Sequence, residues 1–372
     1  MKQVRDDARR VLPEALDAAD ADGPMQAAGV AMAMRDWHRG DFAVAAVSEA
    51  LRTGSDETLD AARASDDIQV RRLAYRSWLA SGRADSDALV QAALTEVDII
   101  CQSLLAEAVV RAAVRDRQRD TLDRLLAAHF ARIRVEALAG LVQIGQPEAG
   151  EDFLADRSAM LRATAQWAMR RAGRDAAERY RMMLASGDDS RLRGVVAGLG
   201  ECGTVDDVES LACFLRHERP AVRAEAVRAM RRLGGPLGQI AEMLTDPAPA
   251  VVRAVAAALR NRPDLLPAER LWELLDADQP RHIRRAAFKV LIARDTWTRL
   301  EADLGLVADP DDKIRARARS DLTGWLVGDA VTTYQMPPPS TRERLGALID
   351  AAAQDIGTRT AHLLRWHLGL SR

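Results

Sequence analysis

The residues that could carry metal or acid–base chemistry are few and scattered along the chain. Two histidines four residues apart on a helix can hold a metal ion, because both rings then project from one face. No histidine pair has this spacing, and the closest pair, His362 and His367, is five residues apart. A His-Glu pair occurs once, at His217 and Glu218. Neither a Gly-rich phosphate loop nor a GxSxG motif is present. We therefore expect a protein that is not an enzyme, with no metal and no cofactor.

Clusters of basic residues are the first feature that favours binding. They lie at residues 228–232, 281–289 and 313–319, and arginine and lysine attract phosphates and carboxylates. The alternative is a solvated face whose charge is neutralised by acidic neighbours such as Asp309, Asp311 and Asp312. The candidate partner-binding residues are one tryptophan and five basic residues: Trp167, Arg228, Arg232, Arg285, Lys289 and Arg317.

Trp167 is the second feature. It follows a recurring arginine by five residues, where the neighbouring units carry Ala139 and Gly198. The large ring can fill the space that the small residues leave, or it can stand exposed as an interface anchor. Three aromatic residues near the chain ends, Trp37, Tyr334 and Trp366, are expected to seal terminal helices.

A dipeptide of an aliphatic residue followed by arginine recurs along most of the chain. From Arg134 onward the spacings are 28, 31, 30, 30, 31 and 31 residues. The gap between Arg71 and Arg134 is 63 residues, about two periods. Its midpoint falls at Ile100 and Cys101, a degenerate unit that lacks the arginine. The recurring arginines are Arg71, Arg134, Arg162, Arg193, Arg223, Arg253, Arg284 and Arg315.

Other positions keep step with this arginine. Alanine mostly stands three residues later, a large apolar residue seven later, and glycine eleven later at Gly82, Gly145, Gly173 and Gly234. This spacing predicts one helical stripe that ends at a glycine in the left-handed region. Aspartate and proline open the units, and a shorter second helix is expected before the next turn, for example over 207–216 and 268–276.

The residues 218–226, with the sequence ERPAVRAEA, resemble the HEAT-like repeats of the bacterial phycobilisome-lyase type. The resemblance covers about residues 60–328. It implies an all-α fold, an α-solenoid forming a right-handed superhelix of about nine repeats. It also implies that the eight arginines are structural and pair with turn carboxylates of their own or the neighbouring repeat. Cys101 departs from the pattern, so looser packing is expected there.

The extent of the repeats and the atypical ends predict three parts of the chain. Residues 1–59 form an N-terminal helical cap, 60–328 the repeat array, and 329–372 a linker and a C-terminal helical cap. A terminal repeat has only one neighbour and therefore departs from the pattern.

Composition limits the functional classes. The net charge is −2, which disfavours a surface that coats nucleic acid. The three cysteines, Cys101, Cys202 and Cys213, form no CxxC pair, and no apolar stretch is long enough to span a membrane. We expect a soluble cytoplasmic protein with reduced thiols.

The leading hypothesis is a scaffold that binds a protein partner on its concave face. A nucleic-acid-binding mode like that of the HEAT-like alkylpurine DNA glycosylases is an alternative that the charge disfavours, and their site does not align with this chain. A lyase-type accessory role is a third reading, based on repeat type alone. The deoxyhypusine hydroxylases are also HEAT-repeat proteins, but they bind iron through several His-Glu pairs, and this chain has one.

Overall fold

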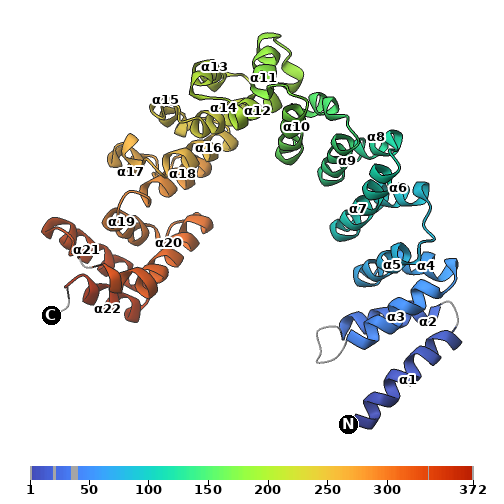
Figure 1. The fold of residues 1–372 in the computed structure, drawn as a ribbon. Helices are drawn as coiled ribbons and strands as arrows, with labels where there is room; N and C mark the ends of the chain where they lie inside the picture. The colour runs from blue at the N-terminus through green and yellow to red at the C-terminus, as the bar shows by residue number, and fades with distance from the viewer. Residues whose placement is uncertain (1, 20–21, 35–40, 334, 371–372) are drawn as a thin grey trace. The chain divides into compact units, whose positions relative to one another are not determined.

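The computed structural model describes residues 2–19, 22–34, 41–333 and 335–370. Trp37 and Tyr334, which were expected to seal terminal helices, lie outside these residues. All regular structure in the described part of the chain is helical, and Figure 1 shows successive helices stacked side by side. The predicted all-α solenoid is confirmed.

The contacts divide the chain into two compact units, Met1–Ala176 and Ala177–Arg372. The predicted boundaries of the two caps stay a prediction. The first unit contains α1 (Lys2–Ala18), α2 (Asp22–Ala33), α3 (Asp41–Thr53), α4 (Asp56–Arg63), α5 (Ile68–Ser81), α6 (Ser86–Thr95), α7 (Ile99–Arg115), α8 (Arg119–Leu126), α9 (Ala131–Gln143), the short helix η1 (Pro147–Phe153) and α10 (Ala159–Arg171).

The second unit begins with α11 (Ala176–Ala185), which starts at the boundary residue. It continues with η2 (Asp189–Arg191), α12 (Leu192–Cys202), η3 (Val205–Asp207), α13 (Val208–Ala212), η4 (Cys213–Arg216), α14 (Pro220–Arg232), α15 (Gly238–Ala241), η5 (Glu242–Thr245), α16 (Pro249–Leu259), η6 (Pro263–Leu265), α17 (Ala268–Glu273), α18 (Arg281–Leu291), α19 (Thr296–Leu306), α20 (Asp312–Gly324), η7 (Trp325–Asp329), η8 (Ala330–Thr332), α21 (Pro339–Ile356) and α22 (Thr358–His367).

Each unit has two layers of helices. The helices that carry the recurring motif pack directly on one another: α5, α7, α9 and α10 in the first unit, and α12, α14, α16 and α18 in the second. Shorter helices cover one side of this layer, as α13, α15 and α17 do for α14, α16 and α18 in Figure 1. The two second helices predicted over 207–216 and 268–276 are present, the first as α13 and η4 and the second as α17.

Capping residues set where the motif helices begin and end. Asp67, Asp98 and Asp311 each accept a hydrogen bond from a backbone N–H of the first helical turn, which satisfies a donor that has no partner within the helix. The predicted left-handed glycines are confirmed, with φ angles of 69°, 88°, 71° and 75° at Gly82, Gly145, Gly173 and Gly234.

The recurring arginine has a fixed place in the helix, four residues after the N-cap residue. Its backbone N–H donates to the carbonyl of that N-cap residue. This holds for Arg71, Arg134, Arg162, Arg223, Arg284 and Arg315. The alanine three residues later is fully buried in all six of these helices, at Ala74, Ala137, Ala165, Ala226, Ala287 and Ala318. Small side chains at this position let neighbouring helices approach closely.

Arg253 is not in the predicted position. Its helix α16 has Ala248 at the N-cap, so the fourth residue after the cap is Val252, which is fully buried. Arg253 is one residue further along and is exposed. Pro249 and Pro220 both begin their helices at the first position, and aligning these prolines matches Val252 with Arg223. The prediction of a structural role for Arg253 was therefore wrong in register.

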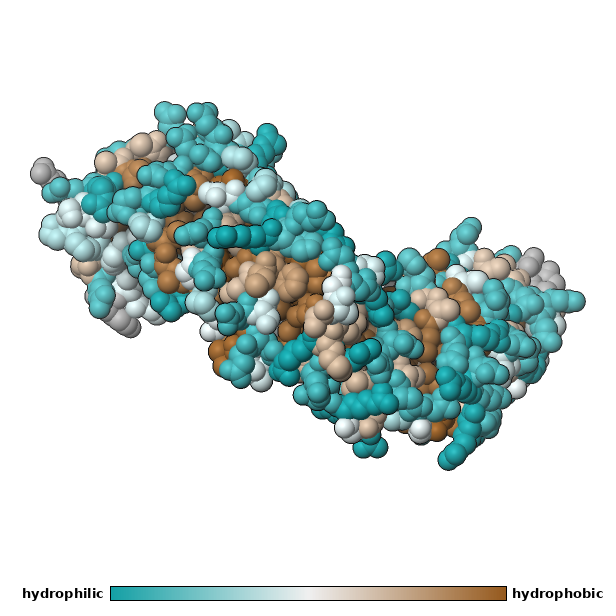
Figure 2. Space-filling view, turned by 90° about the horizontal axis from the view of Figure 1, so that it is seen from above, coloured by the Kyte–Doolittle hydropathy of each residue, from teal (hydrophilic) through white to brown (hydrophobic). Residues whose placement is uncertain are grey.

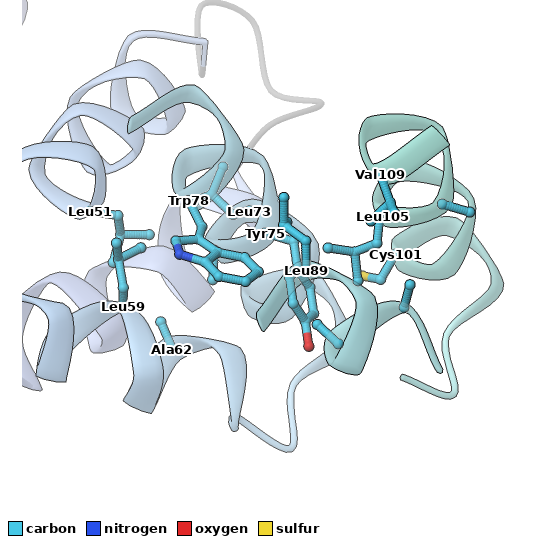
Figure 3. Close-up of a cluster of buried hydrophobic side chains, with 14 of the residues drawn as sticks. Leu51, Leu59, Ala62, Leu73, Tyr75, Trp78, Leu89, Cys101, Leu105 and Val109 are labelled. Carbon is cyan, nitrogen blue, oxygen red and sulfur yellow. The ribbon is translucent and has the colours of Figure 1, made fainter. Parts of the chain in front are cut away.

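The degenerate unit was also predicted one residue out of register. Asp98 is the N-cap residue of α7, so Gln102 stands at the arginine position and donates through its side-chain amide to the carbonyl of Glu96. Cys101 takes the aliphatic position, and it is buried on the side of Leu105 and Val109 (Figure 3). The arginine is thus replaced by glutamine.

Trp78 lies at the predicted apolar position seven residues after Arg71. In Figure 3 its ring extends from α5 toward Leu51 and Leu59 of the preceding helices. The guanidinium of Arg63 lies 4.0 Å from the centre of the ring. The large ring therefore joins three helices in one buried cluster.

The exterior is mainly polar. On the face seen in Figure 2, hydrophilic residues cover most of the surface and hydrophobic residues show between them in separate places. Within the described ranges, no helix combines the length and the apolar character that crossing a membrane requires.

Candidate partner-binding surface

The motif arginines join consecutive repeats. Arg223 donates two hydrogen bonds to the carboxylate of Asp246, each 2.9 Å long. The third guanidinium nitrogen of Arg223 donates a hydrogen bond of 2.8 Å to the carbonyl of His217. The side chain thereby ties the turn before its own helix to the turn before the next helix. Equivalent pairs with the next turn are Arg71–Glu96, Arg134–Asp156 and Arg284–Asp309.

Two other motif arginines use their own turn. Arg162 donates to the carbonyl of Asp156, 2.7 Å away, and Arg315 donates to the carbonyl of Asp309, 2.5 Å away. Arg315 also pairs with Asp312. These contacts occupy the guanidinium groups with the protein's own acceptors.

Arg193 departs from this arrangement. The turn η2 precedes α12, so Arg193 stands two residues after the N-cap residue Arg191 rather than four. Its side chain is exposed, and no hydrogen bond or ion pair from it reaches the described residues. The expected pairing with a turn carboxylate is absent there.

A second set of positions points away from the covering layer. Residues five, nine and twelve after the N-cap lie on one helical face, because they are four and three residues apart. We call this side of the motif helices the open face. In three consecutive motif helices of the second unit it carries mainly cations. We define the basic face as these cations and the adjacent Arg232: Arg228 and Arg231 of α14, Arg253 and Arg260 at α16, and Arg285 and Lys289 of α18.

Carboxylates neutralise only part of the basic face. Glu225 pairs with Arg228, 2.7 Å away, and lies 3.8 Å from Arg232. Arg285 pairs with Asp311, the N-cap residue of α20, at 2.8 Å. The hydrogen bonds and N–H donors around Asp311 hold the pKa of its carboxyl below the ordinary value, against the effect of burial. The acid is therefore ionised and balances Arg285.

Arg253 stands where Arg72 and Arg285 stand in their own helices, five residues after the N-cap. Arg72 pairs with the next N-cap residue, Asp98, as Arg285 pairs with Asp311. The next motif helix after α16 is α18, whose N-cap residue Pro280 offers no carboxylate. Among the described residues, no ion pair involves the exposed cations Arg231, Arg253, Arg260 and Lys289.

Arg317 lies outside the basic face. It stands six residues after Asp311, a position that is buried in α14 and α18 as Glu225 and Ala286. Its side chain is 61% exposed and donates to Asp321 of its own helix, 2.7 Å away. The structure therefore does not bring Arg317 together with the other candidate cations.

Trp167 belongs to the open face of the first unit. It stands nine residues after Ser158, the N-cap residue of α10, in the position that Arg228 and Lys289 occupy in the second unit. The half-buried Ala139 of α9 has the same place in its helix. Trp167 remains 36% exposed, so part of the residue is available for contact.

A shallow depression adjoins the basic face. It is lined by Arg231, Arg262, Leu265 and the turn residues 234–237. Arg262 pairs with Asp264, which leaves Arg231 as the cation at its edge. The depression extends the basic face toward the turns at the ends of α14 and α16.

Sequence reasoning missed one buried acid. Asp303 of α19 is fully buried, and neither carboxyl oxygen has a hydrogen-bond partner among the described residues. Burial is the main reason that its pKa is raised to about 8. The nearby carboxylate of Asp321 contributes to the rise, while Arg299 and Arg317 act in the opposite direction. The only signal in the sequence is its place in an apolar stripe, with Leu300 and Leu304 as buried neighbours.

No group of three or more histidine, cysteine, aspartate or glutamate side chains with a metal-binding arrangement occurs in the part of the chain that the structure describes. His217 forms a hydrogen bond within its own turn, in which its Nδ1 accepts from the backbone N–H of Arg219. In this turn His217 takes the role that Asp246 has in the next one.

Comparison with solved structures gives distant likenesses. One is a crystal structure of an engineered protein from the Northeast Structural Genomics Consortium, 17% identical, with 97% of this chain and 98% of that chain covered and a TM-score of 0.30. Another is importin beta, crystallised in an ammonium sulfate condition, 11% identical, with 99% and 58% covered and a TM-score of 0.37. The chain thus spans 58% of that importin beta chain, and at these TM-scores neither structure indicates what this chain binds.

No curated protein matches the chain. A family model matches part of it, and that part contains the whole basic face. Residues 208–292, from α13 to the residue after α18, match the family of HEAT repeats.

Proposed function

We propose that the chain is a non-catalytic scaffold that binds another protein on the open faces of its motif helices. HEAT repeats commonly serve as protein-interaction scaffolds, and stacked helical repeats present extended surfaces suited to this role. The observation that carries the proposal is the partial exposure of Trp167 on the open face of α10. Tryptophan is enriched among the residues that dominate interface energies.

The motif arginines support this proposal because they hold the scaffold together rather than reach a ligand. Arg223 and Arg284 use their donors on carbonyls and carboxylates within the second unit. The remaining side chains of the open face are then presented on a fixed layer of helices. A cytoplasmic location is part of the proposal and is supported by free thiols at Cys101 and Cys213.

A pull-down with two matched tryptophan variants tests this function. Trp167 is 36% exposed on the open face, and Trp272 is 37% exposed on the covering helix α17. The tagged chain should recover a stoichiometric protein from native lysate. Trp167→Ala should reduce its recovery roughly tenfold, the size typical of an interface anchor, while Trp272→Ala leaves it unchanged. Recovery of no stoichiometric protein, or equal loss with both variants, contradicts the proposal.

A further inference from the structure

The helices of the basic face have an unusual charge balance. Glu225 is the only carboxylate in α14, α16 and α18, whereas each helix contributes arginine or lysine to the surface. Glu225 is buried and already contacts Arg228 and Arg232. The positive charge of Arg231, Arg253, Arg260 and Lys289 is therefore left over on the exposed side.

The leftover cations lie on adjacent helices. α14 packs against α16, and α16 packs against α18, so the basic face crosses three consecutive repeats without interruption. Packed helices are about 8–10 Å apart. An extended peptide advances about 3.3 Å per residue, so every third residue of a peptide crossing these helices meets the next one.

The arginines of this region show which ligand chemistry they accept. Arg285 binds the carboxylate of Asp311, and Arg228 binds that of Glu225. A planar guanidinium matches the two oxygens of a carboxylate, and Arg253 has the same helical position as Arg285 without such a partner. A carboxylate from another chain fits the missing contact at Arg253.

A peptide fits this face better than duplex nucleic acid does. Nucleic-acid affinity rises with the number of phosphates that cations neutralise, and here Glu225 and Asp311 have already neutralised Arg228 and Arg285. Ala257, which stands between Arg253 and Arg260 on the open face, leaves room for a peptide backbone.

We propose that the basic face binds an acidic peptide segment in an extended conformation. Carboxylates about three residues apart then face the cations of successive helices, which are Arg231 of α14, Arg253 and Arg260 at α16, and Lys289 of α18. This inference rests on the proposed scaffold function and names the chemistry of the bound protein.

The test measures binding of a defined probe to the full chain. The probe is a fluorescein-labelled peptide of repeated Glu-Ala-Ser triplets, followed by fluorescence anisotropy at low and physiological salt. The comparison probes are the same peptide with lysine in place of glutamate and a labelled DNA duplex. The acidic peptide should bind, the basic peptide should not, and affinity should fall as salt rises.

A double charge reversal locates the site. Arg253→Glu with Lys289→Glu should weaken binding of the acidic peptide tenfold or more. The matched control is Arg216→Glu with Arg359→Glu, which makes the same charge change at exposed arginines of η4 and α22. The control should bind as the unchanged protein does, and circular dichroism checks that both variants are folded.

Three results overturn the inference. Equal loss with both double variants shows that net charge, not the basic face, sets the affinity. Binding of the duplex without binding of the acidic peptide assigns the face to nucleic acid. Binding of no probe, while a stoichiometric protein still depends on Trp167, removes the acidic-peptide inference and leaves the scaffold function standing.

Discussion

Arg223 of α14 and Asp246 of the following turn are joined by two hydrogen bonds of 2.9 Å each. The two side chains are only 13% and 9% exposed, so little water can replace either partner. The same guanidinium also donates to the carbonyls of His217 and Glu218. The pair therefore links two consecutive repeats of the second unit.

Removing this arginine should destabilise the protein. Arg223→Ala leaves the side chain of Asp246 largely buried and without its main partner, which we expect to cost about 2–4 kcal/mol of unfolding free energy. Arg253→Ala is the matched control, because that arginine belongs to the same sequence motif but is exposed. It should change stability by less than about 0.5 kcal/mol. Urea denaturation measures both, and equal effects would show that the ion pair contributes nothing specific.

The buried alanines should tolerate no enlargement. Ala226 is fully buried between helices, so Ala226→Leu should overpack the core and cost about 1–3 kcal/mol. Ala257→Leu places the same extra atoms on the exposed side of α16 and should leave the melting temperature nearly unchanged. Calorimetry compares the two variants. A melting temperature that is unaffected by Ala226→Leu contradicts close packing at this position.

Two glycines should respond to alanine with opposite sign. Gly234 has a φ of 75°, a conformation that costs a side chain about 1 kcal/mol, so Gly234→Ala should destabilise the protein. Gly305 lies within α19 with no atom near the position of an added Cβ. Gly305→Ala should raise stability by about 0.5–1 kcal/mol. Unfolding midpoints that shift in the same direction for both would refute this assignment.

Asp303 should make stability depend on pH. Its pKa rises from about 3.8, the ordinary value, to about 8 in the folded chain. Between these values the folded protein holds a proton that the unfolded chain has released, so stability falls as pH rises from about 4 to 8. The slope from this residue is at most about 1.4 kcal/mol per pH unit.

Asp303→Asn should remove this part of the pH dependence and raise stability at pH 8 relative to the unchanged protein. The exposed Asp120 gives the control variant, Asp120→Asn, which should keep the slope. Urea unfolding at several pH values measures it. The same slope with and without Asp303 would show that other groups cause the dependence.

Much of the fold could be predicted from the sequence because the same local requirement recurs in every repeat. Close helix packing requires the buried alanine after Arg223, and helix termination requires the glycine at Gly234. Both residues therefore recur at a fixed distance from the motif arginine. The predicted register of α16 was wrong because the repeats were aligned on their arginines, and Arg253 is one residue beyond the equivalent position. The proline Pro249 and the exposed Arg260, which stands where a large apolar residue was expected, indicate the correct register.

The candidate surface was less predictable. The sequence showed that Arg228, Arg285 and Lys289 are basic, but not that Arg285 is neutralised by Asp311 while Arg253 forms no ion pair with the described residues. That difference depends on which residue begins the next helix, Asp311 or Pro280. The burial of Asp303 likewise depends on α19 packing against α20 and α21, which no local pattern reveals.

Site-specific photocrosslinking tests the central claim most directly, because it reports which layer of helices a bound protein touches. A benzophenone amino acid would replace the exposed alanines Ala163 and Ala257 on the open faces, and Gln91 and Ser210 on the covering helices α6 and α13. The account predicts that irradiation in native lysate links one protein to the chain from Ala163 or Ala257, with no product from Gln91 or Ser210. Products from the covering helices alone, or equal products from all four positions, would contradict it.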